Sequence, residues 1–289
     1  MAKPVEPAPA VGGFLHPFSK LHGNREAVTA PPLTTRPEVR RIGLADLRTA
    51  LGAGWRDYAG HRSDVAMLCV LYPALGLILA RAAYGYHFLA LLFPLAAGFA
   101  LLGPLAATGL YEMNRRIEAG EQVTWLTAFA VLRARGFAAV LVLGLMFGVM
   151  FIVWLQLAEL IYEAFLGGAA PHSLATFLTG VFATRAGWQM IVVGDLVGLG
   201  FAIVALVVGT FAFPMLIDGR HGRDTGERMT LAVVTSLHAA AANPVPLAAW
   251  GLIVAALLVL GSIPLFLGLV VVVPVLGHAT WHLYRRVVV

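Results

Sequence analysis

Six apolar stretches follow one another after about residue 64, separated by short polar turns. A helix needs roughly 20 residues to cross a hydrocarbon core about 30 Å thick, and each stretch is close to that length. The pattern therefore predicts an all-α fold, a polytopic membrane helix bundle with about six transmembrane helices. The expected spans are 65–83, 87–112, 137–160, 191–217, 245–262 and 265–283.

Two segments precede this predicted transmembrane domain, which covers residues 63–289. Residues 1–41 contain seven prolines among small and polar residues, a composition typical of a disordered tail. Residues 42–62 place apolar side chains at helical spacing between charged ones, which predicts an amphipathic helix. This helix either lies on the membrane surface or packs against the protein's own helices.

The distribution of basic residues predicts the orientation of the bundle. With an internal N-terminus, 18 of the 20 Lys and Arg residues fall on the cytoplasmic side, and only Arg81 and Arg185 fall outside. Because translocation of positive charge is disfavoured, both termini are expected in the cytoplasm of a bacterial-type inner membrane. The first long apolar run begins near Val65, too late for a signal peptide, so we expect the first helix to be an uncleaved anchor.

The amino-acid composition supports the membrane assignment and argues against a soluble protein, a nucleic-acid-binding protein and a disulfide-bonded protein. The chain is 60% hydrophobic and only 12% charged, with a mean hydropathy of +0.84, which is too apolar for a soluble domain of 289 residues. The net charge of +5 is accounted for by topology, so no nucleic-acid partner is predicted. The single cysteine, Cys69, excludes an intrachain disulfide.

A weak internal repeat appears when the second apolar segment is shifted by 106 residues onto the fourth. The shift aligns residues 120–124 with 226–230, and it pairs Gly103 with Gly209, Leu110 with Leu216 and Glu112 with Asp218. Both units would cross the membrane in the same direction, so the pattern predicts a parallel repeat.

The last predicted helix carries a pair of histidines, His278 and His282, which share a face because they are four residues apart. Two imidazoles at this spacing could bind a metal ion, or one could ligate a haem. Alternatively, together with Trp281 and Arg285 they form an interfacial anchor at the headgroup level. The sequence predicts no other cofactor.

A group of acidic residues is expected at the outer ends of the third and fourth spans, where Glu159 and Glu163 share a helix face and Asp195 lies nearby. Carboxylates at membrane depth are costly unless they are paired or hydrated, so this group is a candidate cation or proton site. Arg81 and Arg185 lie on the same predicted side and offer a purely structural neutralisation.

The cytoplasmic turn after the fourth span is dense in charge and glycine, and it is a candidate partner surface. Its charged residues are Asp218, Arg220, Arg223, Asp224 and Glu227. Asp224 and Glu227 have the spacing of a helix N-cap. No nucleotide-binding loop, zinc-protease motif or nucleophile elbow occurs, so the sequence gives no address for enzymatic chemistry.

Four short motifs resemble an uncharacterised family of bacterial integral membrane proteins. They are the run Phe213 to Asp218, Asn243-Pro244, Trp250-Gly251 and the ending from Gly268 to Arg285. The resemblance covers roughly residues 40–286 and implies a domain of unknown function. Some members carry the label of a cytochrome c oxidase subunit I, but this chain has too few helices and histidines for a complete haem–copper centre.

The leading functional hypothesis is a non-enzymatic accessory, assembly or scaffold component of a membrane complex. The labels of the family that the chain resembles imply a respiratory complex. A small transporter or channel is the alternative, and haem or metal binding through His278 and His282 is the third hypothesis. The expected partners are the lipid bilayer and membrane-complex subunits, and the sequence does not determine an oligomeric state.

Overall fold

The computed structural model describes residues 37–61, 89–167, 173–264 and 266–289. The chain divides into two units, 1–32 and 33–289, and all described residues lie in the second. The predicted tail, except for its last residues from 37 on, and the first predicted span, 65–83, lie outside the described residues.

The described residues confirm the all-α fold class. The one extended pairing among them is an antiparallel bridge between Val39 and Val288. The helices are α1 (Leu44–Gly60), α4 (Leu89–Leu101), α5 (Gly103–Ala106), α6 (Thr108–Glu118), the 3₁₀ helix η1 (Trp125–Arg133), α7 (Phe137–Leu166), α8 (Leu174–Phe182), α9 (Arg185–Asp218), α10 (Thr225–Ala242), α11 (Pro244–Ser262) and α12 (Leu269–Val287).

Three of the described helices, α7, α9 and α11, are long and apolar enough to cross a membrane. They coincide with the predicted spans 137–160, 191–217 and 245–262. The predicted span 87–112 instead breaks into α4, α5 and α6. Pro104, at the start of α5, has no N–H to continue the hydrogen-bond ladder of α4, which gives a physical reason for this break.

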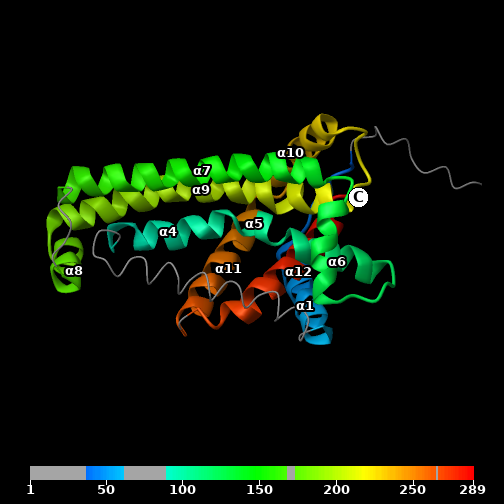
Figure 1. Ribbon diagram of the computed structural model, residues 1–289, viewed down its shortest axis with the longest axis horizontal. Coiled ribbons are helices and arrows are strands. Elements are labelled where there is room, and N and C mark those ends of the chain that lie inside the picture. Colours follow the sequence, from blue (N-terminus) through cyan, green and yellow to red (C-terminus); the bar gives the residue numbers. More distant parts are fainter. Residues whose placement is uncertain (1–36, 62–88, 168–172, 265) are drawn as a thin grey trace, which may run out of the picture. The chain divides into compact units, whose positions relative to one another are not determined.

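The pair α7 and α9 runs antiparallel and side by side (Figure 1). Phe147 of α7 meets Phe213 of α9 edge to face, with 5.2 Å between ring centroids. At the start of α7, Gly136 lies directly against the backbone of Leu216, so the absence of a side chain allows the close approach. At the other end of the pair, Ser173 and Thr184 cap α8 and α9 through their side-chain oxygens.

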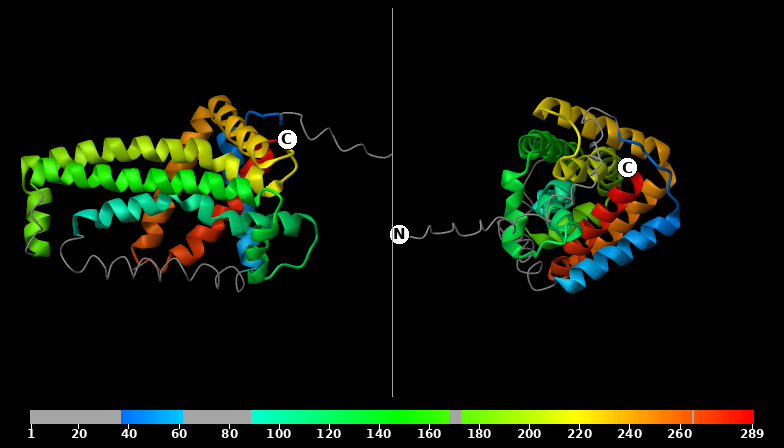
Figure 2. Two further views of the ribbon diagram at one scale, coloured as in Figure 1. Left: turned by 45° about the horizontal axis from the view of Figure 1, so that its top comes forward. Right: turned by 90° about the vertical axis from the view of Figure 1, so that its right-hand side faces the viewer.

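The helices α1, α11 and α12 lie across the α7–α9 pair, as the end view in Figure 2 makes plain. The last two predicted spans correspond to the helices α11 and α12. These helices do not run parallel to α7 and α9. Much of α12 is buried inside the protein, including His278 and Trp281, which are fully buried.

The α1 helix packs against α12, which is the second of the two placements that its amphipathic pattern allowed. Leu47, Ala50 and Gly54 form its buried face. A Cβ atom on Gly54 would lie 2.7 Å from the carbonyl oxygen of Val275, so the two backbones are nearly in contact there. Beside this face, Leu44 and Trp55 remain exposed.

The two units of the suggested repeat differ in their connecting segments. After α6 the chain forms the nine-residue 3₁₀ helix η1, whereas after α9 it forms the 18-residue α-helix α10. The parallel repeat, the number of spans and the location of the termini remain predictions.

Candidate functional site

The last two turns of α12 join three other helices through charged and polar side chains. The connected residues are Asp46 and Asp57 of α1, Glu118 of α6, Asp218 of α9, and Trp281, His282, Tyr284, Arg285 and Arg286 of α12. We call this set the polar end of the bundle. It lies near the C-terminus in Figure 1.

Arg285 is the centre of the polar end. Its guanidinium donates to Asp218 Oδ2 at 2.9 Å and to Glu118 Oε2 at 2.7 Å, and it lies 4.8 Å from the centroid of the Trp281 ring. Burial alone would lower the pKa of Arg285, but the charges of Asp218 and Glu118 outweigh it and raise the pKa. The fork of Arg285 therefore holds α6 and α9 together at α12.

Two buried aromatic side chains donate further hydrogen bonds to the same carboxylates. The indole N–H of Trp281 donates to Glu118 Oε1 at 2.7 Å, and the Tyr284 hydroxyl donates to Asp218 Oδ2 at 2.9 Å. Burial, together with the nearby negative charge of Asp218, raises the pKa of the Tyr284 phenol well above its usual value. The fold thus favours the protonated phenol.

This raised pKa predicts a loss of stability in alkali. Because the folded pKa of Tyr284 exceeds the unfolded value of about 10, its contribution is complete below pH 10 and is lost as pH rises through the folded pKa. We expect the unfolding temperature of the wild type to fall more steeply between pH 9.5 and 11 than that of Tyr284→Phe. Thermal scans of both proteins in detergent test this, and parallel curves would contradict it.

The N-terminal part of the described chain is fastened to the same end of the bundle. His282 Nε2 hydrogen-bonds Asp57 Oδ2 at 2.5 Å, and Arg286 pairs with Asp46 at 2.9 Å. Asn243, between α10 and α11, accepts the Ile42 N–H at 2.8 Å and donates to the Arg40 carbonyl at 3.0 Å. These contacts place residues 40–60 firmly against α10 and α12.

The two predicted histidine ligands have separate partners. His278 is fully buried, and its Nδ1 hydrogen-bonds Asn114 Oδ1 at 2.8 Å, whereas His282 contacts Asp57. Within the described ranges, no group of three or more His, Cys, Asp or Glu residues could hold a metal ion. His278 Nε2 and Asn114 Nδ2 are buried without a hydrogen-bond partner.

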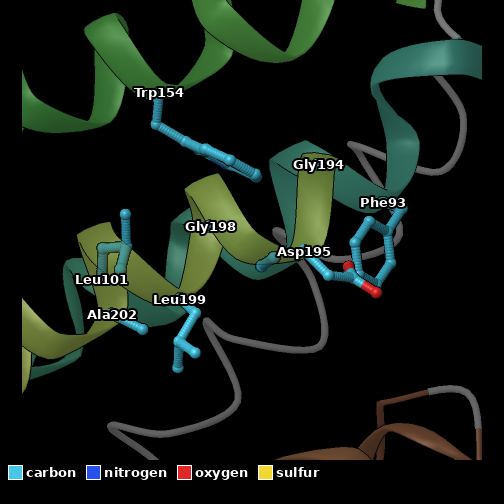
Figure 3. Close-up of a pocket in the computed structure, with 9 residues that line it drawn as sticks. Phe93, Leu101, Trp154, Gly194, Asp195, Gly198, Leu199 and Ala202 are labelled. Atoms are coloured by element: carbon cyan, nitrogen blue, oxygen red, sulfur yellow. The ribbon is translucent and has the colours of Figure 1, made fainter. Parts of the chain in front are cut away.

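The predicted outer acidic residues lie on α7 and α9, and all three are exposed. Asp195 lines a groove of about 270 Å³ between α4, α7 and α9, whereas Glu159 and Glu163 are not part of it. Figure 3 shows the Asp195 carboxylate beside the Phe93 ring. Trp154 of α7 lines the same groove. Asp195 therefore does not form one site with the two glutamates in this groove.

The charged turn after α9 contains the predicted helix cap, which is confirmed. Asp224 Oδ1 accepts the Glu227 N–H at 2.9 Å, and Glu227 Oε2 accepts the Arg223 N–H at 2.8 Å. Arg220 reaches back to Asp218 at 3.1 Å while remaining 65% exposed. Of the five residues predicted as a partner surface, Asp218 is the one that is mainly structural, because its side chain is 3% exposed.

Sequence reasoning missed Glu118, Asn114 and Asp57, which complete the polar end and the His278 contact. They come from α6 and α1, more than 160 residues away from α12. The available signal was the density of hydrogen-bonding side chains in α12 itself, since buried polar groups need partners.

The apolar helices and the described fold define an integral membrane protein of the helical class. In this chain, residues 92–218 match the model of DUF2189, a family described as a predicted integral membrane protein. No curated protein and no solved structure matches the chain.

The family match confirms the recognition of an uncharacterised membrane-protein family. It extends from α4 to the end of α9, so it includes the run from Phe213 to Asp218 but not the C-terminal motif. The cytochrome oxidase label of some members has no counterpart in the match.

Proposed function

We propose that the protein is a non-enzymatic accessory, assembly or scaffold component of a membrane complex in the bacterial inner membrane. The observation that carries this proposal is the polar end, where α1, α6, α9 and α12 are joined by charge-assisted hydrogen bonds. Such a network fixes the ends of four helices relative to one another. In the orientation favoured by the basic residues, it faces the cytoplasm.

The turn between α9 and α10 is the proposed partner surface. Its helix cap and the Arg228 contact with the Gly219 carbonyl, at 3.1 Å, restrict its backbone, while Arg220 and Arg223 remain exposed. A preorganised turn loses less conformational entropy on binding than a flexible one. Its exposed guanidinium groups suit an acidic surface on a neighbouring subunit.

A pull-down from native membranes in mild detergent tests this function. We expect stoichiometric recovery of subunits of one membrane complex with the wild type, and respiratory complexes are the first to test. Reversing the charges in Arg220→Glu/Arg223→Glu should abolish recovery. The matched control is Arg133→Glu/Arg135→Glu, which reverses two exposed arginines just before α7. Recovery of the chain alone, or equal loss in both variants, would sink the proposal.

A small transporter or channel is the second candidate, and the Asp195 groove is the observation that favours it. Ion or solute flux in proteoliposomes that is lost in Asp195→Asn would support it.

Haem or metal binding through His278 and His282 is the third candidate. A visible absorption spectrum and elemental analysis of the purified protein decide it, because an empty spectrum without metal removes it.

A further inference from the structure

The groove between α4, α7 and α9 has one charged group in an otherwise apolar lining. Its walls are Phe93, Ala97, Leu101, Trp154, Gly194, Asp195, Gly198, Leu199 and Ala202. Among the residues that the structure describes, Asp195 has no hydrogen-bond or ion-pair partner. Its carboxylate therefore offers a negative charge to whatever enters the groove (Figure 3).

Asp195 lies at a depth where an unpaired charge is costly. The α9 helix has 34 residues, so it is about 51 Å long at 1.5 Å per residue and exceeds the hydrocarbon core. Asp195 comes ten residues after Arg185, the first residue of α9, or roughly 15 Å along the helix. A core about 30 Å thick that is centred on α9 therefore contains Asp195 in its outer part, where an unpaired carboxylate still costs free energy, although less than at the bilayer centre.

Aromatic rings complete the chemistry of the groove. Trp154 is fixed because its indole N–H donates to the Pro94 carbonyl at 2.8 Å, and its ring has room beside Gly198, where a Cβ atom would lie 3.0 Å from it. Phe93 stands beside the Asp195 carboxylate (Figure 3). Aromatic faces attract cations, and this attraction strengthens when water is excluded.

The kind of cation follows from the same lining. A hard metal ion such as Ca²⁺ needs about six to eight oxygen ligands, whereas the side chains of this groove supply one carboxylate. An organic cation needs one counter-charge and apolar walls, because its hydration shell is weak. We propose that the groove is a binding site for a hydrophobic organic monocation, held by Asp195 against Phe93 and Trp154. This site is independent of the partner surface proposed above.

The charge requirement is tested with benzyltrimethylammonium and with neopentylbenzene, which has the same shape but no charge. Binding to the full chain in maltoside micelles is measured by titration. We expect the cation to bind, the hydrocarbon to bind at least tenfold more weakly, and Asp195→Asn to weaken the cation at least tenfold. Glu159→Gln, the matched loss of an exposed carboxylate outside the groove, should leave binding unchanged. Equal binding of both ligands, or an unaltered Asp195→Asn, overturns the proposal.

The shape requirement is tested at two glycines of α9. Gly194 lines the groove and Gly200 does not, and a Cβ atom at either meets nothing within 4 Å. Both variants should therefore fold. Gly194→Leu should fill the groove and abolish cation binding, whereas Gly200→Leu should bind as the wild type does. Equal binding by the two variants would place the cation elsewhere and refute the site.

A lipid headgroup and a free solute could supply the same ammonium chemistry, so a third arm separates them. Phosphatidylethanolamine that competes with the probe, while phosphatidylglycerol does not, identifies the cation as a lipid headgroup. Absence of competition by either lipid identifies a free solute. Both results support a cation site, and the wild-type pull-down is unaffected by them, so the two proposals can fail separately.

Discussion

Asp218→Asn should lower the free energy of unfolding by about 3 kcal/mol, because it leaves a largely buried arginine without one of its two carboxylates. The Asp218 side chain is 3% exposed and that of Arg285 is 19% exposed. The asparagine also brings an N–H₂ group to a position where Tyr284 and Arg285 both donate. Denaturation in mixed micelles, followed by tryptophan fluorescence, measures the change.

Glu121→Gln is the matched control for this prediction. Glu121 also pairs with an arginine, Arg116, at 3.0 Å, but its side chain is 50% exposed. Exposed pairs contribute less than about 1 kcal/mol, so this variant should unfold close to the wild type. If the two variants proved equally stable, the polar end would not be a stabilising network, and the scaffold proposal would lose its structural support.

Gly54→Ala should detach α1 from α12 and cost about 2 kcal/mol, in the range of overpacked cores. The new Cβ would lie 2.6 Å from the Ala279 nitrogen and 2.7 Å from the Val275 carbonyl oxygen. Both are backbone atoms, so neither can move without shifting α12 itself. Faster tryptic cleavage at Arg48 and Arg56, together with a lower unfolding free energy, is the expected result.

Gly52→Ala provides the control within the same helix. Its Cβ would have only the flexible end of Arg56 nearby, at 3.7 Å. Alanine favours a helix over glycine by up to about 1 kcal/mol, so this variant should be as stable as the wild type or more stable. A stabilised Gly54→Ala would mean that α1 does not pack on α12 in the membrane.

Asp218→Asn and the double variant Arg220→Glu/Arg223→Glu also test the proposed function. Asp218→Asn loosens the junction of α9 and α12 without removing an exposed charge from the turn. Arg220→Glu/Arg223→Glu reverses the exposed charges of the turn, and it also removes the Arg220–Asp218 ion pair but keeps both contacts of Asp218 with α12. If the turn binds its partner because it is preorganised, Asp218→Asn should weaken the pull-down partially. The groove lies on other residues, so cation binding should survive both variants.

The sequence by itself determined the class of protein. Runs such as 137–160 and 191–217 are apolar over the whole length that a bilayer requires, and no globular fold of this size could bury them. Local chemistry also determined the cap at Asp224, because its partner is only three residues away. These features depend on residues close together in the chain.

Tertiary structure decided which side chains meet. The sequence suggested that His278 and His282 act together, since they share a helix face. In the structure they have different partners, because His278 contacts Asn114 and His282 contacts Asp57. It grouped Asp195 with Glu159 and Glu163, whereas the groove includes Asp195 alone. Helix periodicity specifies a face but not the helix that packs against it, and that choice depends on contacts across more than 160 residues.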